Sequence, residues 1–190
     1  MACSVPNSRR GICLVGFMGA GKTSVGRSLA HRFGWVFTDL DDLVEARAGR
    51  RVAEIFRSEG ESAFRKAELT ALHEVLQDGP DARPLVLALG GGAFVQPAVA
   101  RAIFEAGMPC VFLDASLEEL RRRCAPEGAQ RPLFQDENRF RQLYETRRPD
   151  YMKADVRIDT TGLTVEQVAA EITRRLGFEV SGSRAESEGI

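Results

Sequence analysis

The chain has 190 residues, of which 44% are hydrophobic and 28% charged, a size and composition typical of one globular domain with a substantial core. Its formal net charge of −1 excludes a bulk attraction to nucleic acid or to anionic membranes, so small molecules are the expected partners. The four cysteines have no metal-binding spacing, which argues against a zinc site and favours reduced thiols in a cytoplasmic protein.

The first predicted strand, Ile12–Val15, leads into a glycine-rich stretch, Gly16–Thr23, that fits the pattern G-x-x-x-x-G-K-[ST]. The glycines let backbone N–H groups point at phosphate oxygens, while Lys22 reaches the β- and γ-phosphates and the Thr23 hydroxyl coordinates Mg²⁺. Apolar residues then recur at helical spacing over Lys22–Phe33, so the stretch lies at a helix N-terminus, where the dipole favours anions. We therefore expect the chain to bind a nucleoside triphosphate.

Two carboxylates, Asp39 and Asp41, follow the next predicted strand, Trp35–Phe37. In a parallel sheet this strand would end beside the phosphate loop. Asp39 could then hold Mg²⁺ through water, and Asp41 could orient or deprotonate an attacking hydroxyl. The alternative is that Asp41 or Asp42 only caps the helix predicted over Asp41–Ala48.

The segment after these carboxylates predicts two helices, Val52–Arg57 and Glu61–Gln77. Arg65 and Glu68 lie on one face of the second helix. A guanidinium fork at this position can grip a ligand carboxylate while Glu68 orients it. The alternative is an ordinary solvated ion pair.

Three glycines, Gly90–Gly92, follow the predicted strand Leu85–Leu89. Residues without a Cβ allow a ligand to approach the backbone closely, and the alternative is a plain tight turn. Pro97 suits the first turn of the next predicted helix, and Thr164 suits the N-cap of the last one.

The rest of the chain repeats the alternation of short apolar runs and amphipathic segments, which is the βαβ signature of an α/β fold with a parallel sheet. The remaining strands are predicted at Cys110–Leu113 and Val156–Ile158, and the remaining helices at Pro97–Glu105, Leu117–Arg123, Glu137–Arg147 and Thr164–Leu176. Between residues 124 and 136 the chain has proline, glycine and polar residues without periodicity, which predicts a mobile lid containing Arg131. We expect flexible tails at 1–10 and 179–190 around a single domain, 11–178.

Together these residues resemble the shikimate kinase family of phosphate-loop (P-loop) kinases. The family's marks occur in family order between residue 11 and about residue 176. They are Gly16–Thr23, Asp39 with Asp41, Ile55 with Phe56, Gly60 with Glu61, Phe64 with Arg65, Gly90–Gly92, Arg131 with Pro132 and Leu133, and Arg147 with Pro149 and Tyr151. The resemblance implies a five-stranded parallel sheet flanked by helices, with a lid that closes over ATP.

The resemblance also implies transfer of the ATP γ-phosphoryl group to the 3-hydroxyl of shikimate, a step of aromatic amino-acid biosynthesis. ATP and shikimate are then the expected partners of a monomer, with Mg²⁺ as cofactor. The implied catalytic residues are Lys22, Asp41 and Arg131. The implied ATP-binding residues are Gly19, Ala20, Gly21, Lys22, Thr23, Ser24, Arg131 and Arg123, the last with Arg122 as a rival. The implied shikimate-binding residues are Asp41, Phe56, Phe64, Arg65, Gly91, Gly92 and Arg147, and the implied Mg²⁺ residues are Thr23 and Asp39.

Two alternatives to this function are a P-loop kinase of another small polyol acid such as gluconate, and a nucleotide-binding module without catalysis. The first would not need Arg65, Arg147 and the glycine turn to converge on one carboxylate and a ring. The second would be expected to have lost part of the acceptor constellation, whereas Asp41, Arg65, Arg131 and Arg147 are all present.

Overall fold

The computed structural model describes residues 10–77, 83–125 and 136–178. Its strands are β1 (Gly11–Val15), β2 (Val36–Asp39), β3 (Leu85–Ala88), β4 (Cys110–Asp114) and β5 (Val156–Asp159). Its helices are α1 (Lys22–Phe33), α2 (Leu40–Ala48), α3 (Val52–Leu76), α4 (Pro97–Glu105), α5 (Leu117–Cys124), α6 (Glu137–Tyr151) and α7 (Val165–Leu176). The strands form one parallel sheet in the order β2-β3-β1-β4-β5.

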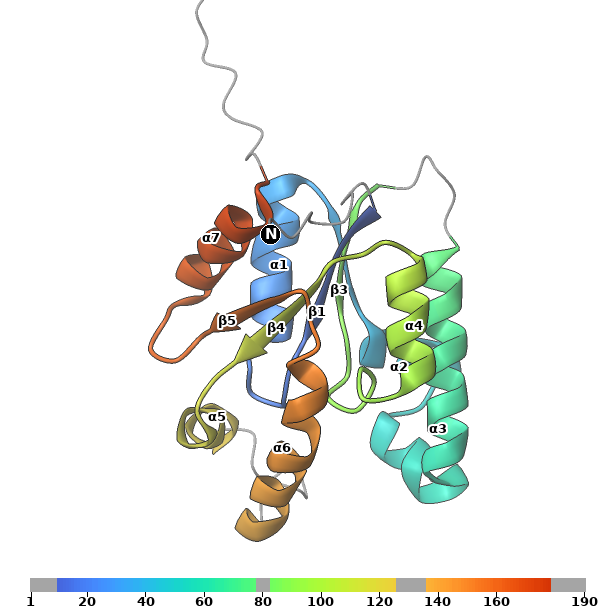
Figure 1. Ribbon diagram of the computed structural model, residues 1–190. Coiled ribbons are helices and arrows are strands. Elements are labelled where there is room, and N and C mark those ends of the chain that lie inside the picture. Colours follow the sequence, from blue (N-terminus) through green and yellow to red (C-terminus); the bar gives the residue numbers. More distant parts are fainter. Residues whose placement is uncertain (1–9, 78–82, 126–135, 179–190) are drawn as a thin grey trace, which may run out of the picture.

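The sheet is covered on both faces, with α1 and α7 on one face and α3 and α4 on the other (Figure 1). Every residue of β1 and β4 is buried, as expected for central strands of a two-sided parallel sheet. Their apolar side chains join the helices in one continuous core. The predicted α/β fold with a five-stranded parallel sheet flanked by helices is therefore confirmed.

The sheet order places a topological switch point at β1. The chain leaves β1 through α1 towards β2, whereas it leaves β3 through α4 towards β4 on the other side of β1. In open parallel sheets the crevice for a ligand forms at the carboxyl ends of strands that diverge in this way. The loop after β1 is the phosphate-binding stretch, so the topology positions it in this crevice.

Several predicted element boundaries differ from the structure. The second strand is shifted towards the carboxyl end, to Val36–Asp39. The two helices expected on either side of residues 58–60 form α3, with a kink at Gly60, whose φ of 81° and ψ of 173° are non-helical. The helix expected to end at Arg147 continues past Pro149 to Tyr151. A proline removes one hydrogen bond of the helix, but the buried Tyr151 anchors the last turn.

Several expectations fall on residues outside the described ranges. These are the lid between residues 126 and 135, with Arg131, and the two tails up to residue 9 and from residue 179. Cys124, where the lid was expected to begin, is the buried last residue of α5. Within the described part of the chain no helix is long and apolar enough to cross a membrane. Cys13, Cys110 and Cys124 are buried and form no disulfide.

Candidate active site

A cleft of about 1050 Å³ opens at the carboxyl end of the sheet, at the upper end of the range for small-molecule sites. It runs from the acceptor-side helices α2 and α3, past the phosphate loop, to α5 and the turn before α7. The cleft collects nearly all of the predicted site residues, namely Gly19, Ala20, Gly21, Lys22, Thr23, Ser24, Asp39, Asp41, Phe56, Phe64, Arg65, Gly91, Gly92, Arg123 and Arg147. The exception is Arg131, which lies outside the described residues.

The phosphate loop depends on its glycines, as the two closest to α1 show. Gly19 and Gly21 have φ angles of 78° and 92°, in the region that only glycine enters without strain. A Cβ at Gly19 would also lie 2.9 Å from the carbonyl oxygen of Leu120. Gly21 is the N-cap of α1, where no side chain caps the helix and the first turn holds no acidic residue. The N-terminus of α1 therefore presents its amides and positive dipole end to an anion.

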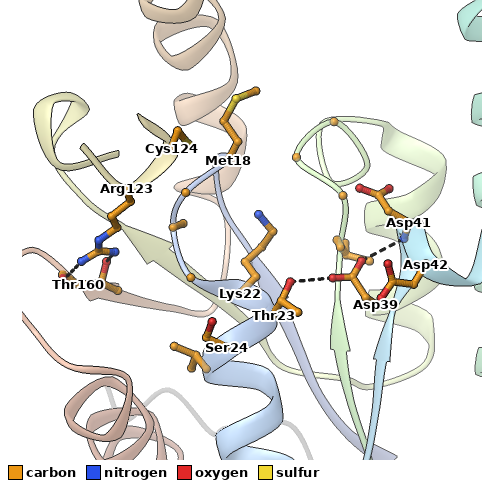
Figure 2. A pocket seen from close by; sticks show the side chains of 18 of the residues that line it. Met18, Lys22, Thr23, Ser24, Asp39, Asp41, Asp42, Arg123, Cys124 and Thr160 are labelled. Carbon is orange, nitrogen blue, oxygen red and sulfur yellow. Dashed lines mark hydrogen bonds between the residues drawn. The ribbon is translucent and has the colours of Figure 1, made fainter. Parts of the chain in front are cut away.

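Lys22 arches back over the phosphate loop. Its Nζ donates hydrogen bonds to the carbonyl oxygens of Gly16 at 2.9 Å and Phe17 at 3.0 Å. Figure 2 shows its side chain rising between Arg123 and Thr160 on one side and Asp39 and Asp41 on the other. The ammonium therefore lies between the two halves of the cleft.

The carboxylate of Asp39 ties the phosphate loop to the start of α2 (Figure 2). Its Oδ2 accepts the hydroxyl of Thr23 at 2.9 Å, and its Oδ1 accepts the backbone N–H of Asp41 at 3.1 Å. Asp39 is thus the N-cap of α2, and the alternative that Asp41 or Asp42 caps the helix is wrong. The reason is that the helix begins at Leu40, one residue earlier than expected, which leaves the Asp41 side chain available for chemistry.

Asp41 is half-buried and points towards the glycine turn. A Cβ at Gly90 would overlap the carboxylate oxygens of Asp41, so the side chain occupies the space that this glycine leaves. Burial raises the pKa of Asp41 to about 6; the negative charges of Asp39 and Glu68 act in the same direction, and Lys22 and Arg65 act against them. A carboxylate with this pKa can accept a proton near neutral pH.

Arg65 enters the cleft from α3 and is held by two carboxylates. Its Nη1 lies 2.9 Å from Oε2 of the fully buried Glu68, and its Nη2 lies 3.1 Å from Oε1 of Glu61. The same Oε2 of Glu68 accepts Nε2 of Gln96 at 2.8 Å. A Cβ at Gly92 would overlap the Arg65 guanidinium. The solvated ion pair considered from the sequence is therefore wrong for this pair, because Glu68 is 0% exposed.

Two phenylalanines of α3 form an apolar wall next to Arg65. The rings of Phe56 and Phe64 have centroids 4.7 Å apart, and Cζ of Arg65 lies 5.2 Å from the Phe64 centroid. The kink at Gly60 lies between the two phenylalanines in the chain, and both side chains line the cleft.

The last turn of helix α6 reaches Gly91, the middle residue of the glycine turn Gly90–Gly92. Nη1 of Arg147 would lie 3.5 Å from a Cβ at Gly91. The hydroxyl of the buried Tyr151 donates a hydrogen bond to the carbonyl oxygen of Gly91. Burial raises the pKa of Tyr151 to about 12, so the phenol keeps its proton and can act as this donor.

Gly90 and Gly92 therefore each make room for a charged side chain from a different helix, Asp41 from α2 and Arg65 from α3, and Arg147 from α6 lies at contact distance from Gly91. A plain tight turn would not require this. Sequence reasoning did not find the supporting roles of Gln96 and Tyr151. Gln96 carries no sequence signal beyond its place before Pro97, whereas Tyr151 belongs to the family pattern.

At the far end of the cleft Arg123 is fixed by the turn that follows β5. Its Nη1 and Nη2 lie 3.1 Å and 2.7 Å from Oγ1 and the carbonyl oxygen of Thr160, as Figure 2 shows. Its Nε contacts Glu119 at 2.8 Å. The side chain of Arg122 also pairs with Glu119 but is 73% exposed, compared with 22% for Arg123. Both arginines line the cleft, and Arg123 is the less exposed of the two and the one that also contacts Thr160.

The comparisons with known proteins agree with this geometry. The family model for shikimate kinase matches residues 18–177. The chain is 42% identical to the shikimate kinase of Thermus thermophilus over 90% of its length and 92% of the relative, and 42% identical to that of Geobacter metallireducens over 90% and 93%.

Among solved structures, the shikimate kinase of Acinetobacter baumannii in complex with shikimate has a TM-score of 0.79 and 34% identity over 93% of this chain and 96% of that one. A gluconokinase of Sinorhizobium meliloti has a TM-score of 0.60 at 18% identity over 90% and 93%, which indicates a shared fold alone. The family match over most of the chain and the two relatives at 42% identity establish that this chain belongs to the shikimate kinase family.

Proposed function

We propose that this protein transfers the γ-phosphoryl group of ATP to the 3-hydroxyl of shikimate, giving shikimate 3-phosphate and ADP. The observation that carries the proposal is the meeting of Asp41, Arg65 and Arg147 around one glycine turn beside the phosphate loop. Shikimate carries a ring, hydroxyls and one carboxylate, and the cleft offers a partner for each.

The carboxylate of shikimate would be bound by the guanidinium groups of Arg65 and Arg147. Charge-assisted hydrogen bonds from a guanidinium are short and directional, and Arg65 is already held in place by Glu68. The ring would lie against Phe56 and Phe64, and the backbone of Gly91 and Gly92 would meet its hydroxyls. This arrangement selects a rigid cyclic acid over a flexible chain, because the acid and hydroxyl partners are fixed relative to one another.

The reacting hydroxyl would be placed at Asp41. As its oxygen bonds to the γ-phosphorus, the bond to the β,γ-bridging oxygen of ATP breaks, and Asp41 accepts the hydroxyl proton. Phosphoryl transfer depends on in-line positioning and on cations around the transferring group more than on covalent chemistry. Lys22 would supply one such cation. Arg131 stays a prediction for a second, since it lies outside the described residues.

A magnesium ion fits the oxygen donors next to the phosphate loop. The Thr23 hydroxyl already contacts Asp39 at 2.9 Å, so an ion at Thr23 would have a carboxylate within reach through water. Mg²⁺ keeps several waters and is bound by few protein oxygens together with substrate phosphates. When bound it would neutralise charge on the β- and γ-phosphates. Addition of EDTA is expected to abolish turnover, and excess Mg²⁺ is expected to restore it.

The nucleotide base would lie at the other end of the cleft, against the guanidinium of Arg123. Glu119 and Thr160 hold this group in a fixed plane, which suits stacking on a flat ring. That the protein acts as a monomer in the cytoplasm stays a prediction.

The deciding experiment measures ADP release with shikimate, quinate, gluconate or no acceptor. We expect strong turnover with shikimate alone. Preferred turnover of gluconate would favour the polyol-acid kinase alternative. ADP release that no acceptor stimulates would leave a nucleotide-binding module, and either result would reject the proposed function.

A further inference from the structure

Asp114 is the last residue of β4 and lies behind the cleft rather than in it. Its side chain is 4% exposed. Oδ2 accepts Nη2 of Arg148 at 2.8 Å and Nε of Arg157 at 2.9 Å, while Oδ1 has no hydrogen-bond partner among the described residues. A buried carboxylate is costly unless it is paired, and here one oxygen anchors two guanidinium groups.

One of these anchors leads to the acceptor half of the cleft. Arg148 follows Arg147 on α6, and neighbouring residues of a helix point about 100° apart. The contact of Arg148 with Asp114 therefore sets how α6 is rotated, and with it where Arg147 stands over Gly91. A second contact, from the Tyr144 hydroxyl to the carbonyl oxygen of Ala115 at 3.3 Å, attaches the same helix to the end of β4.

The backbone of Asp114 leads to the nucleotide half. Its carbonyl oxygen accepts both the N–H of Thr160 at 2.7 Å and the Thr160 hydroxyl at 3.0 Å. The Thr160 hydroxyl and carbonyl oxygen in turn hold the guanidinium of Arg123. The side chain of Asp114 thus holds Arg148, the neighbour of Arg147, and its carbonyl oxygen holds Thr160, the partner of Arg123.

We propose that Asp114 is a positioning residue for both substrates, which fixes Arg147 through Arg148 and Arg123 through Thr160. The inference rests on the proposed function, because it assigns the two ends of the cleft to shikimate and ATP. It adds that the two substrate sites share one buried support that neither substrate touches.

The test compares the KM for shikimate with the KM for ATP in three variants, which are expected to change the two constants differently. Arg148→Met removes the tie between Asp114 and α6 and is expected to raise the KM for shikimate several-fold with the KM for ATP within about twofold. Thr160→Val removes only the hydroxyl and is expected to do the reverse. Asp114→Asn withdraws the charge that holds Arg148, so it is expected to raise the KM for shikimate on the order of tenfold. It keeps the backbone carbonyl that holds Thr160, so the KM for ATP is expected to stay within about twofold.

Matched controls separate positioning from general destabilisation. Asp155→Asn removes the charge of an aspartate that directly precedes β5, whose Oδ2 accepts the N–H of Cys110 at the other end of β4. Thr173→Val removes a buried hydroxyl bonded to the carbonyl oxygen of Ala169 in α7. Both are expected to lower the melting temperature without changing either KM.

Any of three results would overturn the inference. In Asp114→Asn, both KM values could stay within twofold of the unaltered chain, or Asp155→Asn could shift the KM values as much as Asp114→Asn does. Arg148→Met and Thr160→Val could also fail to differ in which KM they raise. If Asp114→Asn does not fold, the split between the other two variants decides. The affinity for ADP, measured by calorimetry, reports on the nucleotide half of the cleft even in variants that show no turnover. An unaltered chain that binds ADP but does not phosphorylate shikimate would reject the proposed function, which is a different result from an absent split.

Discussion

The carboxylate of Asp41 occupies the space that the missing side chain of Gly90 leaves open. We therefore predict that Gly90→Ala lowers kcat although the new methyl group touches no substrate. The methyl would push the carboxylate away from the acceptor hydroxyl, and small misplacements of a reacting group can cost about 10²-fold. Steady-state kinetics with shikimate would check this. Gly91→Ala in the same turn is the matched control. A Cβ at Gly91 would have its nearest neighbouring atom at 3.5 Å, so kcat should fall less than in Gly90→Ala. Gly107→Ala is a poor control because Gly107 has φ of 68°.

The pKa of Asp41, raised to about 6, predicts an acid limb in the pH profile. A base must be deprotonated, so kcat/KM for shikimate is expected to fall as the pH drops through about 6 and to level off above it. Asp41→Asn is expected to lower kcat by roughly 10²-fold or more and to remove this limb. An unchanged limb in the variant would assign the titration to another group.

The same shift has a consequence for stability. The carboxyl group has an ordinary pKa of 3.8 when unfolded and about 6 when folded, so the folded state binds more protons between these values. Stability contributed by Asp41 is therefore greatest below pH 4 and is lost as the pH rises through 6. Asp41→Asn removes the buried charge and should raise the melting temperature at pH 7 without substrates, which thermal denaturation at pH 5 and pH 7 can compare. A lower melting temperature in the variant at pH 7 would mean that the carboxylate stabilises the fold.

Much of this organisation follows from local sequence signals. The strands and the phosphate loop could be predicted because an apolar run, a glycine loop and an amphipathic helix follow one another directly between Ile12 and Phe33. The cap at Asp39 was missed because a helix start one residue earlier than expected changes which side chain reaches the first amides. The roles of Gln96 and Asp114 could not be predicted, since their partners lie 28 and 34 residues away in the chain and only the folded sheet brings them together.

The glycine turn Gly90–Gly92 is a second place where contacts between residues far apart in the chain could not be predicted. The sequence indicated a place where a ligand meets backbone, but the space at Gly90 and Gly92 also holds the side chains of Asp41 from α2 and Arg65 from α3, and Arg147 of α6 reaches Gly91. Tyr151 is 60 residues further along the chain than Gly91, so no local pattern could specify that Arg147 and Tyr151 meet Gly91.

Arg65→Lys is predicted to impair shikimate binding selectively. The Arg65 guanidinium spans Glu61 and Glu68, and an ammonium cannot contact these carboxylates and the shikimate carboxylate with the same fixed geometry. The KM for shikimate should rise on the order of tenfold or more, with ADP affinity unchanged by calorimetry. An equal loss of nucleotide affinity would place Arg65 outside the acceptor site.

Lys22→Met is predicted to abolish nearly all turnover and to leave the protein folded. The variant retains most of the apolar stem of Lys22 but loses the ammonium that would face the γ-phosphoryl group. The two hydrogen bonds of Nζ to the carbonyl oxygens of Gly16 and Phe17 are lost as well, so circular dichroism and a thermal melt must accompany the kinetics. Retention of most of kcat in a folded variant would remove Lys22 from the mechanism.

The two neighbouring arginines at the end of α5 allow a matched test of the nucleotide end. The side chain of Arg123 is 22% exposed and contacts both Glu119 and Thr160. The side chain of Arg122 is 73% exposed and pairs with Glu119. Arg123→Ala is expected to raise the KM for ATP by about tenfold, as loss of a stacked guanidinium would, and to leave the KM for shikimate unchanged. Arg122→Ala removes the same charge one residue away, so it controls for the general electrostatic effect and should change the KM for ATP by less than about twofold, as expected for an exposed ion pair. If the effects are reversed, Arg122 is the arginine that meets the base; if they are equal, the nucleotide responds to charge alone and neither side chain stacks on it.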